Sequence, residues 1–563
     1  MLSVPARAAL LGALFAALVT LPGLGIGTLW DNSETAYGEV AREVLLTHDW
    51  VVMHLNGQPW FIQPPLYFWI AALLAKLFGV SAFALRLPSA LATIAMGGAV
   101  GYATARIAGG RAGMVAAIVL STSLMQAIVG RLAIMDALLD FAVAAAVLWW
   151  YRAFEPTGDA RRRDTAFICG ALALAIGTLA KGPVAPVITV LVIGVWVLWE
   201  RRAGRLAAPH PYALALAALA YLAVTLPWFI ALDAKVGPQA IVELIGHYTV
   251  GRYTGVIENQ RGPFWYYVPV VILGFFPWIA FFPVASMTAW REAVRRDGAF
   301  ARLAVSWAIV PFVFFSFANT KLPNYVALIL PALSIIVALW FERVRAGAER
   351  RAAVISAATV PIFVGLVGVA IVIFVRTNRL EVDTKVVGGE LIFLGAAMLL
   401  CSLLTVVALA RGRTAAWAPY VLAGTSGALV LFIAFVAEPA AEPLKPIPPL
   451  ARTIVAQRQP GDVVGNHGVS GGNGLIFYTS PPVVDVVNNA SFSALICKVS
   501  GAWVVTVPKD GNHLVDRARS QGRNAEIIAV APDAAHPRAT LLHVFGDPCQ
   551  NEALRSSPSN PSP

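Results

Sequence analysis

Two carboxylates, Asp31 and Glu34, stand three residues apart directly after the first long apolar run of the chain. They open the segment 31–46, which has apolar residues at helical spacing on one side and charged residues on the other. This pattern predicts an amphipathic helix lying on a membrane surface. A carboxylate placed there is suited to act as a general base toward a substrate held in the membrane. The pair would also suit helix capping, and both roles stay open.

A third carboxylate and several cations are expected at the outer ends of later apolar runs. The carboxylate is Asp136, and an acid at a membrane edge is costly enough to favour a functional role, here the orientation of a substrate. Lys181 also has a purely structural interpretation, in which its ammonium group extends to the membrane surface to remain hydrated. The cations suited to bind a phosphate are Arg131, Lys181, Arg252 and Lys321.

Neither the histidines nor the four cysteines of the chain have the spacing of metal ligands. The sequence therefore predicts no metal site, and it leaves a divalent metal open without naming ligands for it. Cys169 and Cys401 lie inside apolar runs, where a small packed side chain is the expected role. Cys497 and Cys549 lie in the polar C-terminal segment, and we expect them to pair if that segment faces an oxidising compartment.

Helices that cross a membrane must position these residues, because the chain is too apolar for a soluble fold. Of its 563 residues 58% are hydrophobic and 13% charged, with a mean hydropathy of +0.71. Apolar runs of roughly 17 to 25 residues recur along it, each long enough to cross the bilayer as a helix. The net charge of +11 arises largely from arginines in short loops between these runs, which are topology signals, so no nucleic-acid partner is expected.

Fourteen apolar runs are candidate spans, and we expect about thirteen of them to cross. Arginine-rich loops separated by pairs of runs are expected in the cytoplasm, with residues 30–64, 233–264 and 438–563 outside. A cytoplasmic N-terminus then requires an odd number of crossings. One candidate between residues 66 and 129 should therefore fail to cross, and the shortest is 66–80. The candidates lie near residues 8–29, 66–80, 88–107, 112–129, 133–152, 165–181, 184–199, 208–232, 265–287, 300–318, 322–341, 352–375, 391–409 and 416–437.

The sequence predicts two domains. Residues 1–437 are expected to form an all-α polytopic membrane domain whose external loop, 30–64, carries the chemistry. Residues 438–563 begin with a proline-rich linker and continue with short apolar runs separated by Gly, Pro and Asn, which predicts a small soluble α/β domain. The final residues, SSPSNPSP, have the composition of a disordered tail.

The external loop resembles that of a known family. The order Glu34-x-x-Tyr37-x-Glu39-x-Ala41-Arg42-Glu43, then Asp49-Trp50, Gly57 and Phe61-x-x-Pro64, is similar to the first external loop of the bacterial 4-amino-4-deoxy-L-arabinose lipid A transferase and protein O-mannosyltransferase-like group. These enzymes are glycosyltransferases of the C-type fold (GT-C). The resemblance covers about residues 20–340 and continues through RLAIMD (131–136), Lys181-Gly182-Pro183, Gly251-Arg252-Tyr253, the motif at Pro263–Tyr267, Pro277-Trp278, Phe315-Ser316 and Lys321-Leu322-Pro323-x-Tyr325.

The resemblance implies a GT-C membrane enzyme with an undecaprenyl-phosphate sugar donor and a lipid A-like or other lipid or glycan acceptor. It also implies an active site on the periplasmic side of the bacterial inner membrane. Such a donor already carries its leaving group, so the enzyme must deprotonate an acceptor hydroxyl and stabilise the departing phosphate. Glu34 occupies the matching slot of the family and is the first candidate base, with Asp31 second. Tyr37 and Tyr325 lie in matched motifs and are expected to contact the substrate.

Three positions depart from the family pattern. Ser33 stands where the family has Asp, and Asp31 lies two residues earlier. Ile62 and Gln63 stand where the family has an acidic residue and a lysine. These departures leave open the alternative that the chain is a catalytically silent homologue that binds lipid. A secondary transporter is the other alternative, and matched halves with broken helices would favour it.

Overall fold

The computed structural model describes residues 2–156, 159–202, 206–257, 260–376, 384–469, 472–480, 482–532 and 538–549. The chain divides into two compact units. The membrane unit comprises Met1–Gly25, Trp50–Val52 and Phe61–Ala437. The C-terminal unit comprises Ile26–Asp49, Met53–Trp60 and Glu438–Pro563. The segment that follows the first apolar helix thus belongs to the same unit as the C-terminal residues.

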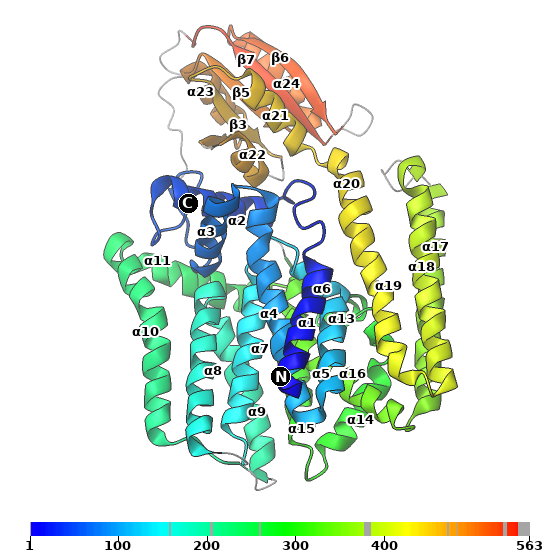
Figure 1. Cartoon of the computed structure of the whole chain (residues 1–563). Helices are drawn as coiled ribbons and strands as arrows, with labels where there is room; N and C mark the ends of the chain where they lie inside the picture. The colour runs from blue at the N-terminus through cyan, green and yellow to red at the C-terminus, as the bar shows by residue number, and fades with distance from the viewer. Residues whose placement is uncertain are drawn as a thin grey trace. The chain divides into compact units, whose positions relative to one another are not determined.

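Most described residues of the membrane unit lie in helices, and the described part of the chain has nine helical stretches that are long and apolar enough to cross a membrane. Neighbouring long helices such as α8, α9 and α10 run side by side (Figure 1). The chain is therefore a polytopic all-α membrane protein with an added small sheet, which confirms the predicted fold class, while the number of thirteen crossings stays a prediction. Six of these stretches lie in α4 (Ala82–Ala108), α8 (Ala160–Lys181), α9 (Val184–Arg202), α10 (Pro211–Val236), α15 (Ala299–Phe317) and α17 (Arg350–Arg376). The stretch Gly389–Arg411 lies in α18 (Thr384–Arg411), Pro323–Arg345 contains α16 (Leu330–Arg345), and Ala415–Leu444 contains α19 (Ala418–Phe432).

Three shorter apolar helices, α1 (Val4–Thr20), α3 (Leu66–Phe78) and α5 (Gly110–Thr122), belong to the same unit. Helix α3 has 13 residues, which is about 20 Å of helix against a hydrocarbon core of about 30 Å. The helix in the run 66–80 is thus too short to cross as a straight helix, and which candidate between residues 66 and 129 fails to cross stays a prediction. The run 112–129 becomes α5 followed by a short α6 (Leu124–Val129).

The expected span 265–287 is not one helix. It is divided into α13 (Tyr267–Gly274), a short 3-10 turn at Trp278–Ala280 and α14 (Phe282–Ala293). Pro277 and Pro283 lie at the two breaks, where each removes a backbone donor that a continuous helix would use. The apolar composition of this region indicated a crossing but not its interruption.

Small residues allow α1, α4 and α5 to pack closely. A Cβ atom on Gly113 of α5 would lie 2.3 Å from the carbonyl oxygen of Gly101 on α4, and one on Gly12 of α1 would lie 3.0 Å from that of Gly97. Gly97 and Gly101 are four residues apart on α4, so they share one face. In lipid there is no hydrophobic force between helices, and such close backbone packing supplies much of the attraction.

Four further elements of the membrane unit carry candidate site residues or adjoin them. They are α7 (Asp136–Ala153), the π-helical turn η1 (Glu243–Gly251), α12 (Arg252–Thr254) and the 3-10 segment η3 (Pro323–Ile329).

The C-terminal unit contains a five-stranded mixed sheet of order β4-β3-β5-β7-β6. Strands β4, β3 and β5 are parallel, and β7 runs antiparallel to both β5 and β6. The strands are β3 (Val463–His467), β4 (Val483–Asp485), β5 (Gly501–Thr506), β6 (Asn524–Ala531) and β7 (Ala539–Phe545). The helices are α2 (Ser33–Thr47), α21 (Ile447–Gln457), α22 (Gly472–Thr479), α23 (Asn489–Lys498) and α24 (Pro508–Ser520), and a hairpin is formed by β1 (His54–Leu55) and β2 (Gln58–Pro59).

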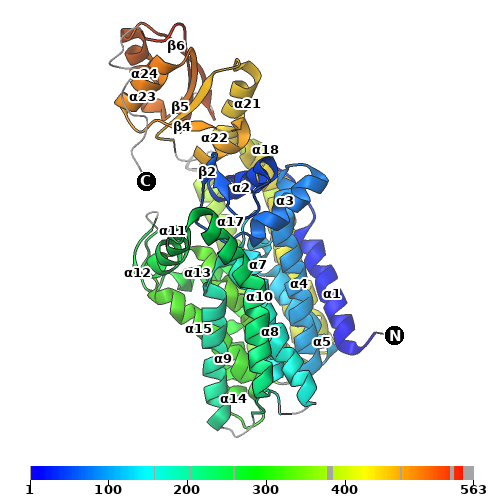
Figure 2. The same cartoon turned by 90° about the vertical axis from the view of Figure 1, so that its left-hand side faces the viewer.

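Alternating residues of the central strand β5 supply the two cores of this sheet. Val504 packs with α23 and α24 on one face, whereas Trp503 and Val505 pack with α21 and α22 on the other. Figure 2 shows α23 and α24 on one side of the sheet and α21 on the opposite side. The period of two along the strand is the pattern that a sheet covered on both faces requires.

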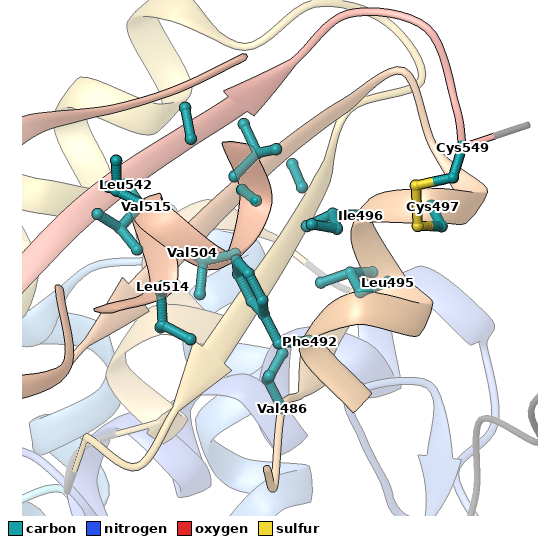
Figure 3. Close-up of a cluster of buried hydrophobic side chains, with 14 residues drawn as sticks. Val486, Phe492, Leu495, Ile496, Cys497, Val504, Leu514, Val515, Leu542 and Cys549 are labelled. Atoms are coloured by element: carbon teal, nitrogen blue, oxygen red, sulfur yellow. A yellow bond between two sulfur atoms is a disulfide. The ribbon is translucent and has the colours of Figure 1, made fainter. Parts of the chain in front are cut away.

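Cys497 and Cys549 form a disulfide, with their Cα atoms 4.5 Å apart. It lies at the edge of the apolar cluster around Phe492 and Leu514, where it joins the end of α23 to the chain after β7 (Figure 3). This confirms the predicted pairing. Cys169 and Cys401 are free.

Candidate active site

The predicted surface helix is present as α2, but its charged face is not exposed. Glu34, Glu39 and Glu43 have exposed fractions of 2%, 0% and 2%. Helix α2 therefore presents buried carboxylates rather than a hydrated surface.

The two candidate bases lie at the start of α2 in different environments. The Glu34 carboxylate accepts a hydrogen bond of 2.8 Å from the backbone amide of Trp30. The Asp31 carboxylate accepts one of 2.6 Å from the Thr35 hydroxyl and another from the backbone amide of Gly474. Burial raises the pKa of Asp31 to about 6, and these two hydrogen bonds oppose the rise. A carboxyl whose pKa lies near neutrality is well matched to proton abstraction.

Glu39 and Glu43, one turn apart on α2, have separate partners. Glu39 forms an ion pair with Arg42, 2.6 Å between Oε2 and a guanidinium nitrogen. Burial is the largest influence on its carboxyl and raises its pKa to about 7, against the opposing effect of Arg42. Both oxygens of Glu43 lie 3.1 Å from the amide of Gly57, which closes the turn between β1 and β2. These two acids hold the local fold and are less available for chemistry than Asp31.

The hairpin turn at Asn56-Gly57 is fastened to the sheet. The side-chain amide of Asn56 donates to the carbonyl of Val483, 2.7 Å, and its oxygen accepts from the amide of the same residue, 2.8 Å. Asn56 and Gly57 both have positive φ, 58° and 73°, the conformation that a tight hairpin turn demands and that Asn and Gly adopt most easily. Val483 begins strand β4, so the turn pairs with the edge of the five-stranded sheet.

In the membrane unit, three predicted residues meet at one place. Asp136 is the first residue of α7 and Lys181 the last of α8, and Lys181 Nζ lies 2.5 Å from Asp136 Oδ1. Asn324 of η3 donates to the same oxygen at 2.6 Å. The Lys181 ammonium also lies 5.2 Å from the ring centroid of Tyr325, within range of a cation–π contact. Asp136 therefore holds the one cation of this cluster in a defined position.

Two other predicted phosphate ligands bind helix carbonyls. Arg131 donates to the carbonyls of Thr20 and Pro22, 2.7 Å each, at the end of α1. Lys321 is 5% exposed, and its ammonium donates to three carbonyls at the end of α15, those of Phe315, Ser316 and Ala318. Three donors on three acceptors satisfy the ammonium completely. Its geometry is that of a helix C-terminal cap.

Arg252 and Tyr37 remain near polar or aromatic neighbours. The Arg252 guanidinium lies 3.5 Å from the side-chain oxygen of Gln260, and its own carbonyl accepts from the amide of Thr320. The Tyr37 ring packs edge-on against Trp60, with centroids 6.1 Å apart. Tyr37 belongs to the C-terminal unit with Asp31 and Glu34, whereas Arg252 belongs to the membrane unit.

Two polar residues near Asp136 were not predicted from the sequence. Asn324 is the unspecified position of the Lys-Leu-Pro-x-Tyr motif, and only its contact with Asp136 reveals it. Asp140 lies one helical turn after Asp136, 2% exposed, with its Oδ2 atom without a hydrogen-bond partner. The i, i+4 spacing of two acids in an apolar helix was the available signal.

Among the described residues, no group of three or more His, Cys, Asp or Glu is arranged to hold a metal ion.

Comparisons with known proteins agree with the motifs. A family model described as dolichyl-phosphate-mannose-protein mannosyltransferase matches residues 62–228. The undecaprenyl phosphate-alpha-4-amino-4-deoxy-L-arabinose arabinosyl transferase of Edwardsiella ictaluri (strain 93-146) is 32% identical over 359 residues, 64% of this chain and 63% of that protein. The protein of the same description from Erwinia tasmaniensis is 31% identical over 333 residues, 59% of each chain. The match thus spans less than two thirds of the length of these relatives.

A solved structure is similar over nearly the whole chain. The crystal structure of ArnT from Cupriavidus metallidurans bound to undecaprenyl phosphate has a TM-score of 0.76 at 23% identity, covering 95% of this chain and 97% of that chain. Its apo state gives a TM-score of 0.74 at 22% identity. At this identity the likeness establishes the fold. The chain is therefore a sequence relative of the bacterial undecaprenyl-phosphate aminoarabinose transferases and shares the GT-C fold, which confirms the resemblance predicted from its motifs.

Proposed function

We propose that the chain is a membrane glycosyltransferase that moves a sugar from an undecaprenyl-phosphate-type donor to lipid A or another lipid or glycan of the cell envelope. The observation that carries the proposal is Asp31, a largely buried carboxyl with a pKa of about 6 at the start of the helix that follows the first apolar helix. The names of the relatives support the choice of donor.

The reaction needs one base and a stabilised leaving group. Asp31 or Glu34 takes the proton of the acceptor hydroxyl as its oxygen bonds to the anomeric carbon of the sugar. The bond between that carbon and the phosphate oxygen breaks, and undecaprenyl phosphate leaves with the electron pair. A base of this kind typically contributes 10²- to 10⁴-fold in rate. We propose Asp31 as a candidate base in addition to Glu34, because Ser33, which stands where the family has Asp, supplies no carboxylate.

The cations of the membrane unit are proposed to stabilise the departing phosphate. Lys181 is the best placed, since Asp136 and Asn324 fix its position. Arg252 is the second, because a planar guanidinium binds a phosphate through two parallel hydrogen bonds. Arg131 and Lys321 are already engaged with helix carbonyls, so their proposed contribution is to hold the helix ends near the phosphate.

We propose further that the protein lies in the bacterial inner membrane with the active site facing the periplasm. The support is the arrangement of arginine-rich loops, which favours the cytoplasm for the segment around Asp159. Single cysteines at Asp159 and at Ser491 of α23 test it in intact cells with a membrane-impermeant thiol reagent. We expect labelling at position 491 only. Labelling at 159 without permeabilisation would contradict the proposed topology.

The activity is tested with purified protein in liposomes that contain undecaprenyl-phosphate aminoarabinose labelled in the sugar, together with lipid A. We expect label on lipid A and release of undecaprenyl phosphate. A second arm replaces the donor with an undecaprenyl-phosphate hexose and asks which sugar is transferred. The Asp31→Asn, Glu34→Gln double variant should lose transfer, whereas Glu526→Gln, an exposed acid of β6 in the same unit, should keep it.

The alternatives give different results in this experiment. A silent homologue would bind the donor lipid and leave all label on it. A secondary transporter would move label between the two sides of the liposome without transfer to lipid A. Either result would reject the proposed activity.

A further inference from the structure

Helix α22 of the C-terminal unit lies along the start of α2 and contacts it at several points. At its N-terminal end, the Gly474 amide donates to the Asp31 carboxylate. At its C-terminal end, Arg42 of α2 donates to the carbonyl of Phe477, 3.0 Å, and to the hydroxyl of Ser480, 3.3 Å. The two ends of this eight-residue helix thus hold two points of α2 that are eleven residues apart.

The carboxylate and the helix have complementary polarity. Gly474 is the third residue of α22, and the first amides of a helix have no partner inside it. These amides and the helix dipole favour a negative charge at this end, and Arg42 lies at the opposite end, where positive charge is favoured. Asp31 therefore caps a helix that begins 441 positions later in the sequence, at Gly472.

A side chain at position 474 is incompatible with the contact. A Cβ atom there would meet Asp31 Oδ2 at 2.4 Å and the Asp31 carboxyl carbon at 3.0 Å. Glycines are poor residues for the interior of a helix, and α22 has two in its first three residues, Gly472 and Gly474. At position 474 the absent side chain leaves room for the carboxylate.

We propose that α22 is a positioning element for the candidate base: the Gly474 amide at its N-terminal end holds the Asp31 carboxylate in place and favours its ionised form. The inference rests on the proposed function in assigning Asp31 to the reaction. It goes beyond that function because it gives α22, a helix from the C-terminal part of the chain, a part in the chemistry.

The protonation of Asp31 follows from a balance of named influences. Burial raises its pKa, and the Thr35 hydroxyl and the Gly474 amide lower it. Without the amide, burial would keep the proton on Asp31 to a higher pH, and less of the base would be ionised near neutrality. The titratable or charged groups on the two helices around it are Glu34, Tyr37, Glu39, Arg42 and Glu43 on α2 and Tyr478 on α22.

The test variant is Gly474→Ala. The atom that its new methyl group meets is the end of a flexible side chain, so the Asp31 carboxylate should rotate away while the fold persists. The matched control is Gly511→Ala in α24, where the nearest atom to the new Cβ is a methyl of Thr540 at 3.3 Å. Retention of the Cys497–Cys549 disulfide and of a single cooperative melting transition establish that each variant is folded.

The first readout is independent of activity. A carbodiimide reacts with protonated carboxyls, and mass spectrometry of the peptide that contains Asp31 reports the pH midpoint of its modification. We expect a midpoint near pH 6 in the wild-type protein and a rise of about half a unit to one unit in Gly474→Ala, the scale of a lost amide and helix-end interaction. The Gly511→Ala protein should match the wild type. An unchanged or lower midpoint in Gly474→Ala would overturn the proposal.

The second readout is transfer. In Gly474→Ala the acid limb of the kcat/KM profile should move to higher pH, so that the loss at pH 6 exceeds the loss at pH 8. In the Asp31→Asn background the same substitution should have no further effect, because its action passes through Asp31. Additive losses would reveal a merely structural role.

The two proposals fail in different ways. If the wild-type protein transfers no sugar but the labelling midpoint still shifts, the proposed function fails and the positioning role stands. If transfer is normal and neither readout responds to Gly474→Ala, the positioning role fails alone.

Should Gly474→Ala not fold, Arg42→Lys replaces it: the lysine retains the charge beside Glu39 and loses the two-point contact with the C-terminal end of α22. We expect the pH midpoint of Asp31 modification to rise in Arg42→Lys as in Gly474→Ala, and the absence of this rise would count against the proposal.

Discussion

Lys181 Nζ and Asp136 Oδ1 are 2.5 Å apart, joining the last residue of α8 to the first of α7. Their side chains are 15% and 7% exposed, so the pair is largely removed from solvent. Breaking such a pair on one side leaves the other charge without compensation, which costs more than the pair contributes when intact. The two residues are therefore expected to respond to substitution as a unit.

Lys181→Met should lower transfer by roughly 10²-fold or more, because it removes the positioned cation and leaves the Asp136 charge with the hydrogen bond from Asn324 but without its ion pair. The Asp136→Asn, Lys181→Met double variant should regain stability relative to Lys181→Met but not activity. Melting temperatures and kcat/KM of the single and double variants measure the coupling. Lys76→Met, at an exposed lysine of α3, is the control. Equal effects of the Lys76 and Lys181 substitutions would contradict this prediction.

The pH dependence of transfer should follow the Asp31 carboxyl. Its pKa is raised to about 6, and a base is active when deprotonated, so kcat/KM should rise with pH through about pH 6 and then level off. Asp31→Asn should remove that limb and lower turnover by roughly 10²-fold. If Glu34 alone is the base, Glu34→Gln abolishes transfer and Asp31→Asn leaves it near normal.

The same shift gives a stability prediction with a definite sign. The folded protein keeps the Asp31 proton to a higher pH than the unfolded chain, so this group lowers the free energy of unfolding as pH rises from about 4 to about 6. A difference of about two pKa units is on the order of 2 kcal/mol. Asp31→Asn should therefore unfold at a temperature no lower than the wild-type protein at pH 7.5, although it is inactive. A clearly lower melting temperature would indicate that Asp31 serves mainly in structure.

Lys321 should behave as a structural residue. Lys321→Met removes the three hydrogen bonds to the end of α15 and leaves carbonyls without their donor. We expect a fall in melting temperature and a similar loss at all donor concentrations. By comparison, Arg252→Gln should raise the KM for the donor with little change in stability. A raised KM with unchanged stability in Lys321→Met would show a direct contact with the donor.

The disulfide between Cys497 and Cys549 should stabilise the C-terminal unit. It closes a loop with a sequence separation of 52, for which chain entropy predicts about 4 kcal/mol. Replacing both cysteines with serine should lower the melting temperature of this unit, and non-reducing electrophoresis after thiol alkylation should show the bond in the wild-type protein. Equal mobility of the reduced and non-reduced wild-type protein would contradict the bond.

The sequence was most informative where local pattern and general chemistry suffice. Apolar runs identified the membrane fold, and the location of Cys497 and Cys549 identified the disulfide. The break of the run 265–287 was harder, because proline alone does not decide it. Pro88, Pro227 and Pro311 all lie inside continuous helices of this chain, where neighbouring groups compensate for the missing donor.

The site depended on tertiary packing that no local pattern encodes. Asp136, Lys181 and Asn324 meet although they are separated by 45 and 188 positions from Asp136. The burial of Glu39 and Glu43 depends on tertiary packing, whereas helical periodicity tells only which side chains share a face. Likewise Asp31 could be proposed as a base from its position, but its contact with Gly474 joins two distant segments of the sequence.

The pairing of Asn56 with Val483 also protects the sheet from other chains. Strand β4 is an outer strand, and the unpaired amide and carbonyl groups of such a strand are a template for the strands of a second molecule. The Asn56 side chain occupies both groups of Val483. At the other edge, β6 carries an irregularity between Ile527 and Ala529, which interrupts a regular ladder. Both edges are thus blunted, and the sheet resists self-association through strand addition.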